Sequence, residues 1–246
     1  MRKVITMTRT NKDILEIQID HYRDMMKETV KDRGDVLPVI NYFRNDYEEA
    51  LFTIVTRPFS PEQKLVTFAT PLLLNAILPV DKVSITMDAN VSMVDKEEGV
   101  QDIVSPSKDP SSLDIIFSTL YQRDGQSQSE GIQYTIKDKT GDLVFHEDSR
   151  EMFSQDLSKQ SMSGAIADIV FGSFEGDSEL LNQLTEVDTD KERTEEYFMP
   201  MMHLLAQLDY LVMCSQSGID FLKSLGIEDT PFISSKDYND ILKEEE

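Results

Sequence analysis

The first regular pattern in the chain is helical. Apolar residues recur at spacings of four, three and four positions, which places them on one face of an amphipathic helix: Leu15, Ile19, Tyr22 and Met26. Thr10 and Asp13 have the spacing of an N-terminal cap, and Gly34 suits a C-terminal end. The sequence therefore predicts a helix between these limits, with an apolar face that docks on the rest of the fold.

Strand patterns follow this helix. Residues 83–91 alternate between apolar and polar side chains, as in a half-buried strand, and residues 113–121 are nearly all apolar, as in a central strand. The further expected strands are residues 36–43, 50–56, 132–136 and 143–146. The polar segments at residues 95–112 and 122–130 are expected to be surface loops, so the strands form an antiparallel meander.

One helix is expected among the strands. Ser60 and Gln63 match a capping box, and Pro61 suits the first helical turn. A broad apolar stripe follows, which Pro71 is expected to kink and Pro79 to end. So much apolar surface indicates a helix packed against the sheet.

Beyond residue 150 the pattern becomes helical. The expected helices are residues 161–172, 178–187, 194–215, 219–225 and 236–244. The third carries the longest apolar face, and Pro200 either kinks it or marks its start. Four of its side chains are expected to be buried: Leu204, Leu208, Leu211 and Val212.

These patterns predict an α+β fold: a mostly antiparallel sheet with packed helices, followed by a helical C-terminal part. The helix, the sheet and its one packed helix occupy residues 1–150, and the acidic helical part occupies residues 151–246. No linker rich in Gly, Ser or Pro separates the two parts, which favours one merged domain.

Charge narrows the range of partners. The 246 residues include 46 acids and 24 bases, for a net charge of −22. Residues 1–94 hold 13 acids and 12 bases, whereas residues 161–246 hold 19 acids and 5 bases. Such a surface repels nucleic-acid phosphates and anionic membranes, so we expect neither direct nucleic-acid binding nor membrane binding, and a basic protein partner is favoured. No apolar leader is visible and Cys214 is the single cysteine, so a cytoplasmic location is expected.

Candidate chemistry is sparse. The sequence contains no G-x-G-x-x-G, phosphate-binding loop, G-x-S-x-G or H-E-x-x-H motif. The catalytic candidates are His146, beside two acids at a strand end, and Asp114, inside an apolar strand. Four closely spaced carboxylates are the candidate metal ligands: Glu186, Asp188, Asp190 and Glu192. They do not match a calcium-binding loop, and acids before a helix also serve as caps and as favourable charges at its positive end.

Three functions remain open. The favoured one is a non-catalytic protein-protein interaction or structural protein, which could self-associate through its neutral N-terminal third and acidic C-terminal third. The second is a metal-dependent hydrolase with a carboxylate-rich site, which would need a divalent metal; otherwise no cofactor is expected. The third is an acidic nucleic-acid mimic that blocks a basic groove. The sequence leaves open whether the chain is an enzyme, and the missing motifs favour a non-enzyme.

Overall fold

A computed structural model describes residues 9–31, 36–91, 112–137, 142–158, 165–175 and 190–227. Most of the expected loop over residues 95–112 lies outside the described residues, as do the expected helices over residues 178–187 and 236–244. Gly34, the expected end of the first helix, also lies outside them.

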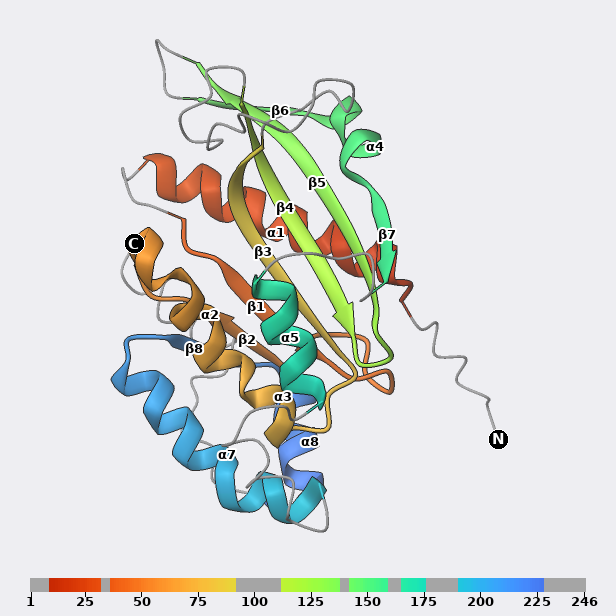
Figure 1. The fold of residues 1–246 in the computed structure, drawn as a ribbon, viewed down its shortest axis with the longest axis vertical. Helices are drawn as coiled ribbons and strands as arrows, with labels where there is room; N and C mark the ends of the chain where they lie inside the picture. The colour runs from red at the N-terminus through yellow and green to blue at the C-terminus, as the bar shows by residue number, and fades with distance from the viewer. Residues whose placement is uncertain are drawn as a thin grey trace.

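The fold is α+β, as predicted, and its centre is an antiparallel sheet of eight strands (Figure 1). The strand order is β6-β5-β4-β3-β1-β2-β8, and β7 also pairs with β5. The strands are β1 (Val39–Phe43), β2 (Phe52–Val55), β3 (Lys82–Val91), β4 (Leu113–Gln122), β5 (Gln126–Ile136), β6 (Leu143–His146), β7 (Gln155–Ser158) and β8 (Leu211–Cys214). The helices are α1 (Asn11–Lys31), α2 (Lys64–Leu72), α3 (Leu74–Ile77), α4 (Arg150–Phe153), α5 (Ala165–Glu175), α7 (Asp190–Gln207) and α8 (Gln216–Ser224), with short turns η1 (Pro61–Gln63) and η3 (Glu147–Ser149).

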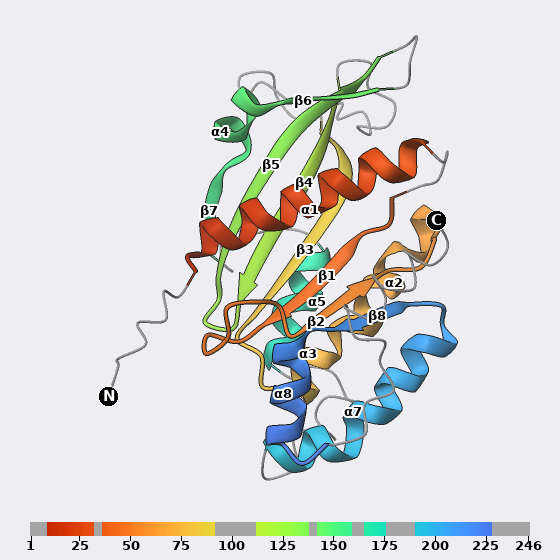
Figure 2. The same cartoon turned by 180° about the vertical axis from the view of Figure 1, so that it is seen from behind.

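The sheet has two differently covered faces. Figure 2 shows α1 crossing one face, and Figure 1 shows α2, α3, α5 and α7 in front of the other. The face under these helices holds the larger core cluster, which includes Tyr42, Phe52, Phe68, Phe198 and Phe221. We call it the helix-packed face, and we call the opposite one the α1 face.

The N-terminal helix agrees with its sequence pattern. The backbone nitrogen of Thr10 donates to Asp13 Oδ2 at 2.9 Å, and the backbone nitrogen of Asp13 donates to Thr10 Oγ1 at 3.2 Å. This reciprocal pair satisfies donors that a helix start would otherwise leave unpaired. The predicted stripe is buried against the sheet: Leu15, Ile19, Tyr22 and Met26. The prediction for this helix is confirmed.

The helix expected around Pro71 is divided at Leu73 into α2 and α3. Proline has no backbone N–H, so the carbonyl of Thr67, four residues earlier, loses its usual helical partner. The hydroxyl of Tyr210 donates to that carbonyl at 2.8 Å, and the hydroxyl of Tyr42 donates to the carbonyl of Pro71 at 2.7 Å. Two buried tyrosines therefore supply hydrogen bonds where the helix is interrupted.

The expected helix over residues 194–215 is wrong in its C-terminal part. Helix α7 ends at Gln207, Asp209 adopts a φ of 62°, and the chain then forms β8, which pairs with β2. Leu204 is 40% exposed, so its expected burial is also wrong, whereas Leu208 packs at the edge of the core. A short apolar run fits a helix or a strand equally well, and pairing with β2 decides between them here.

The loop expected over residues 122–130 is also wrong. Strand β5 begins at Gln126, after a tight turn in which Gly125 has a φ of 86°. Buried polar residues then continue the strand, and the hydroxyls of Ser129 and Thr119 lie 3.0 Å apart across the ladder. Cross-strand hydrogen bonds of this kind allow a polar sequence to lie inside a sheet.

Candidate functional site

A groove of about 770 Å³ runs along α1 on the α1 face. Its size falls in the usual range of binding clefts, roughly 300–1,000 Å³. Helix α1 contacts β3, β4 and β5, and β1, β2 and β8 supply the groove's floor beside it (Figure 2). The groove therefore lies over the part of this face that α1 does not cover.

A second stripe of α1 forms one wall of the groove. Ile14, Ile17, His21 and Met25 follow one another at spacings of three and four and line the groove. Ile14 is buried beside Leu15 and Phe43, whereas His21 is exposed and Ile17 and Met25 are half-buried beside the buried stripe. Helix α1 therefore buries one apolar stripe under itself and presents part of another to the groove.

The floor of the groove carries apolar side chains beside an equal number of polar ones. Val39 and Phe43 from β1 lie buried at its base, and Ala50, with Met213 from β8, is half-buried further out. Side chains alternate along a strand, so Tyr42 points to the helix-packed face instead. The groove therefore places partly exposed apolar side chains of the floor beside those of the α1 stripe.

A hydrogen-bonded amide joins the floor to α1. Asn41 is 3% exposed, and its Nδ2 donates to Gln18 Oε1 at 2.6 Å and to Ser84 Oγ at 3.4 Å. The hydroxyl of Thr53 donates to Asn41 Oδ1 at 2.6 Å. Asn41 thus fixes α1 and three neighbouring strands relative to one another.

The rim of the groove carries three carboxylates and one arginine. Asp24 and Glu28 line it from α1, and Glu49 lines it from the segment before β2, while Arg9 is the base among the lining residues. Lys27 Nζ donates to Asp24 Oδ1 at 2.9 Å, and this bond holds the pKa of Asp24 below its ordinary value. The rim therefore carries negative charge at neutral pH.

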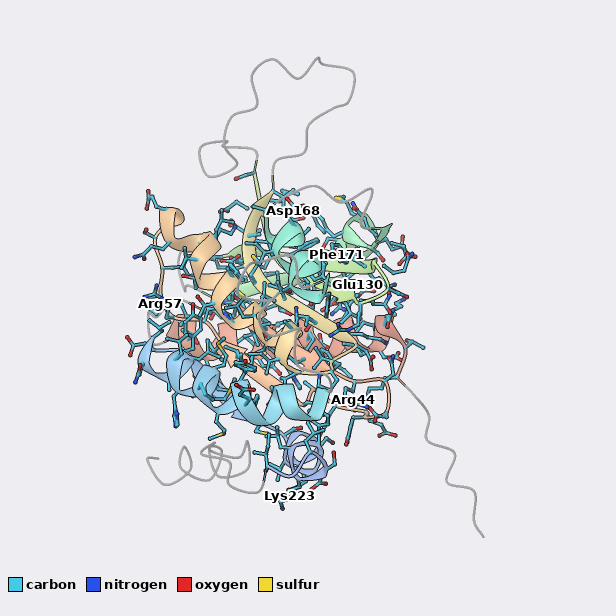
Figure 3. The ribbon with its side chains drawn as sticks, turned by 60° about the horizontal axis from the view of Figure 1, so that its bottom comes forward. Arg44, Arg57, Glu130, Asp168, Phe171 and Lys223 are labelled. Atoms are coloured by element: carbon cyan, nitrogen blue, oxygen red, sulfur yellow. The ribbon has the colours of Figure 1, made fainter. Side chains whose placement is uncertain are left out.

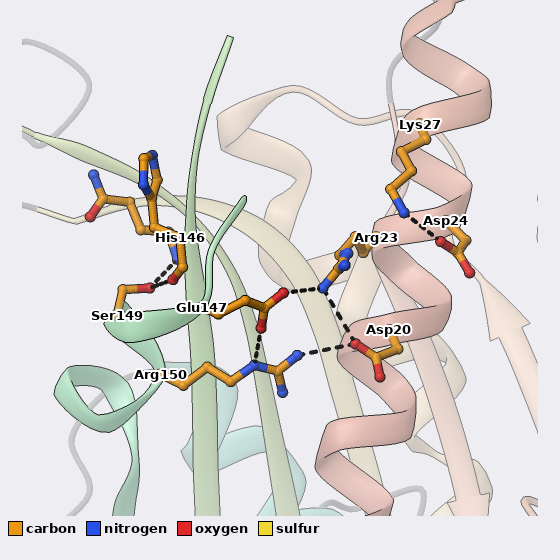
Figure 4. Close-up of polar contacts among 9 residues, drawn as sticks. Asp20, Arg23, Asp24, Lys27, His146, Glu147, Ser149 and Arg150 are labelled. Atoms are coloured by element: carbon orange, nitrogen blue, oxygen red, sulfur yellow. Dashed lines mark hydrogen bonds and ion pairs between the residues drawn. The ribbon is translucent and has the colours of Figure 1, made fainter. Parts of the chain in front are cut away.

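An ionic ring holds α1 on the side away from the groove (Figure 4). Arg23 Nη1 lies 2.6 Å from Glu147 Oε1, and Arg150 Nε lies 3.0 Å from Glu147 Oε2. Arg150 Nη2 and Arg23 Nη1 lie 3.1 Å and 3.8 Å from Asp20 Oδ1. The Arg23 guanidinium also lies 4.9 Å from the ring centre of Phe145. These contacts anchor α1 to β6, η3 and α4.

The structure does not bring the catalytic candidates together. Asn90 Nδ2 donates to Asp114 Oδ1, and Asp114 pairs in register with Tyr134 on the α1 face. His146 pairs with Gln133, one position along β5, and so lies on the opposite face, where its Nε2 is 3.2 Å from Thr135 Oγ1.

The metal candidates are largely outside the described residues. This holds for Glu186 and Asp188, and for the side chains of Asp190 and Glu192, whose backbone lies in the first turn of α7. Over the described ranges, no group of three or more His, Cys, Asp or Glu side chains could hold a metal ion.

A second polar cluster, which no sequence pattern predicted, lies next to the groove and shares Tyr22 with its lining. The hydroxyl of Tyr134 donates to Asp88 Oδ1 at 2.8 Å, and the hydroxyl of Tyr22 accepts from the backbone nitrogen of Asp88 at 3.1 Å. Burial raises the pKa of Asp88, and the nearby Asp114 adds to this effect. The cluster ties α1 to β3 and β5.

Comparisons with known proteins give no match: no protein-family model, no curated protein and no solved structure matches this chain. In the part of the chain that the structure describes, every helix is too short or too polar to cross a membrane.

Proposed function

We propose that this chain is a non-catalytic protein-protein interaction protein, and that the groove beside α1 is its contact site for a basic partner. The observation that carries the proposal is the combination of apolar side chains on the floor and an acidic rim in one groove. Apolar surface drives association, whereas the surrounding charges select the partner and speed the encounter.

The charge of the whole chain supports the same partner class. A net charge of −22 attracts cationic surfaces over a distance of about one screening length, roughly 10 Å at 0.1 M salt. The acids of the rim, Asp24, Glu28 and Glu49, would then pair with individual basic side chains. Binding should weaken as the salt concentration rises.

Affinity capture with matched variants tests the proposal. The immobilised chain is exposed to an extract of its native host, in parallel with the groove variant Asp24→Lys/Glu28→Lys. The control variant is Asp168→Lys/Glu196→Lys, which changes the charge equally at two exposed acids on the helix-packed face; Figure 3 labels Asp168 on α5. Each of these exposed carboxylates contributes little to stability, so both variants should stay folded.

We expect a basic protein that the parent and the control variant retain and the groove variant loses. Its purified form should bind more weakly between about 0.1 M and 1 M salt, over which the screening length falls from about 10 Å to about 3 Å. Equal capture by all three forms, or capture lost equally from both variants, would contradict the groove as the contact site. Sedimentation of the parent alone at both salt concentrations shows whether the retained protein is a second copy of this chain.

A further inference from the structure

We infer that the partner segment in this groove is an amphipathic α-helix, which lies beside α1 over β1 and β2 with its apolar side on the floor and Lys or Arg side chains toward the acidic rim. This inference rests on the proposed function, because it specifies what occupies the same groove.

The backbone of the floor favours a helix over an extended peptide. The floor is the face of a sheet, and the backbone groups of β1 and β2 are already paired on both sides, β1 with β2 and β3, and β2 with β1 and β8. Over the described residues, β8 pairs with β2 and forms the edge of the sheet beyond the floor. An extended peptide lying on this face would leave its own N–H and C=O groups without partners, whereas a helix satisfies them internally. Extended peptides instead add to the edge of a sheet.

The spacing of the elements also fits one helix. Packed helices lie about 8–10 Å apart, and neighbouring strands lie about 4.8 Å apart, so a second helix lies two strand positions away from the first. Helix α1 packs over β3, β4 and β5 and is centred on β4, so two positions along the sheet from β4 is β1, and a second helix there would cover β1 and its neighbour β2. Here Thr53 of β2 and, beside it, Met213 of β8 are half-buried.

The wall and the rim of the groove indicate which side chains the partner helix presents on each of its sides. Ile17, His21 and Met25 recur every four residues along α1, and this row is a ridge of the kind that packs into the groove of a neighbouring helix. Asp24 and Glu28, also four residues apart, lie at one end of the groove, so the partner's basic residues are placed toward that end. Glu49 offers a further acid near Ala50, from the segment before β2.

Selection from a random peptide library tests the inference. The library displays peptides of about 16 residues, long enough for roughly four helical turns. It is selected against the full chain, and each enriched peptide is synthesised and titrated by fluorescence anisotropy. The titrations use the parent, Asp24→Lys/Glu28→Lys, and the control Asp168→Lys/Glu196→Lys, and circular dichroism reports whether the bound peptide is helical.

We expect enriched peptides with apolar residues at positions i, i+3 or i+4 and i+7, an excess of Lys and Arg, and helical spectra when bound. Their affinity should fall about tenfold or more for the groove variant and less than about twofold for the control. Groove-dependent peptides with alternating apolar residues and no bound helicity would overturn the helical occupant and leave the contact site standing. Enriched peptides that ignore the groove variant, or no enriched peptides, would overturn both.

Discussion

The two faces of the sheet bury different chemistry. On the helix-packed face, the ring centroid of Phe52 lies 5.5 Å from that of Phe198 and 6.5 Å from that of Phe221, and the larger apolar cluster surrounds a few paired polar groups, such as Asn75 with Ser173. On the α1 face, polar side chains are buried beside the apolar ones: Asn41, Ser84, Thr86, Ser118 and Glu130. The helix-packed face holds the larger cluster of apolar side chains, whereas the α1 face buries polar side chains of the strands beneath a single helix.

This difference bears on the stability of the fold and on the proposed contact site. Apolar burial is not directional, and it stabilises the fold only where water is excluded. The helices therefore have to cover the helix-packed face completely. A polar interior holds α1 in one position through specific bonds while leaving the adjacent strands accessible. The α1 face can therefore carry an open groove without loss of the main core.

The largest expected effect lies on the helix-packed face. Phe198→Ala removes a fully buried ring that contacts Phe52, and it should lower the free energy of unfolding by about 3–5 kcal/mol. Leu204 lies six residues further along the same helix and is 40% exposed. Leu204→Ala should therefore change the free energy of unfolding by less than about 1 kcal/mol. Urea titrations measure both. Equal losses of stability in the two variants would contradict the assignment of Phe198 to the buried side of α7 and Leu204 to its exposed side.

The next largest effect on stability is expected where a glycine packs closely against neighbouring backbone. A Cβ on Gly218 would lie 2.2 Å from the carbonyl oxygen of Leu51 and 2.7 Å from Cys214 Sγ, so Gly218→Ala should destabilise the fold by about 1–3 kcal/mol. Gly172 in α5 has no atom within 4 Å of its Cβ position, so Gly172→Ala should be neutral or stabilise by about 1 kcal/mol. Thermal melts of the pair compare them. A stable Gly218→Ala variant would show that α8 is not packed closely on β8.

The polar interior of the α1 face is tested by a pair of hydroxyls. Thr86 Oγ1 and Ser118 Oγ lie 2.8 Å apart and are buried. Thr86→Val or Ser118→Ala alone leaves the other hydroxyl unpaired, and each should lower stability by about 1–3 kcal/mol. The double variant should lose less than the sum of the two, because neither hydroxyl remains. Additive losses in a double-mutant cycle would show that the hydrogen bond does not matter.

The smallest expected effect depends on pH. Glu130 lies buried under α1, and burial raises its pKa, with a further contribution from Glu16. Because the folded-state pKa is raised, the protonated form stabilises the fold, and this contribution is lost as pH rises through that pKa. Glu130→Gln should therefore stabilise the chain by about 1 kcal/mol at pH 7.5, and the gain should shrink as pH falls toward 4. A gain that is constant or grows at low pH would contradict this assignment.

Much of the fold could be predicted from local patterns. The stripe of α1 and the strand β3 follow from helical and strand periodicity alone, and both are confirmed. The expected half-burial holds for the second half of β3, whereas Ser84 and Thr86 in its first half are buried under α1. The end of α7 could not be predicted, because the apolar run of β8 becomes a strand only through its pairing with β2. Nor could the polar start of β5, where Ser129 finds its partner, Thr119, on the neighbouring strand.

The groove was harder still to predict. Its floor and wall come from Gln18, Asn41, Thr53 and Met213, which are brought together by the strand order and by no local pattern. One signal was present in the sequence: the second stripe of α1, with Ile14, Ile17, His21 and Met25 at helical spacing. The apolar face of this helix is wider than its contact with the sheet. Part of the apolar face is therefore left for a second contact.

Methionine methyl groups allow the most direct test of the groove as the contact site. Met25 and Met213 line the groove, whereas Met201 and Met202 are buried on the helix-packed face. The chain is labelled with ¹³C at methionine methyls, the signals are assigned by single substitutions to leucine, and a groove-dependent peptide or the captured partner is added. We expect the signals of Met25 and Met213 to shift on saturation while those of Met201 and Met202 stay in place. Unshifted Met25 and Met213 signals in the saturated complex would contradict the account.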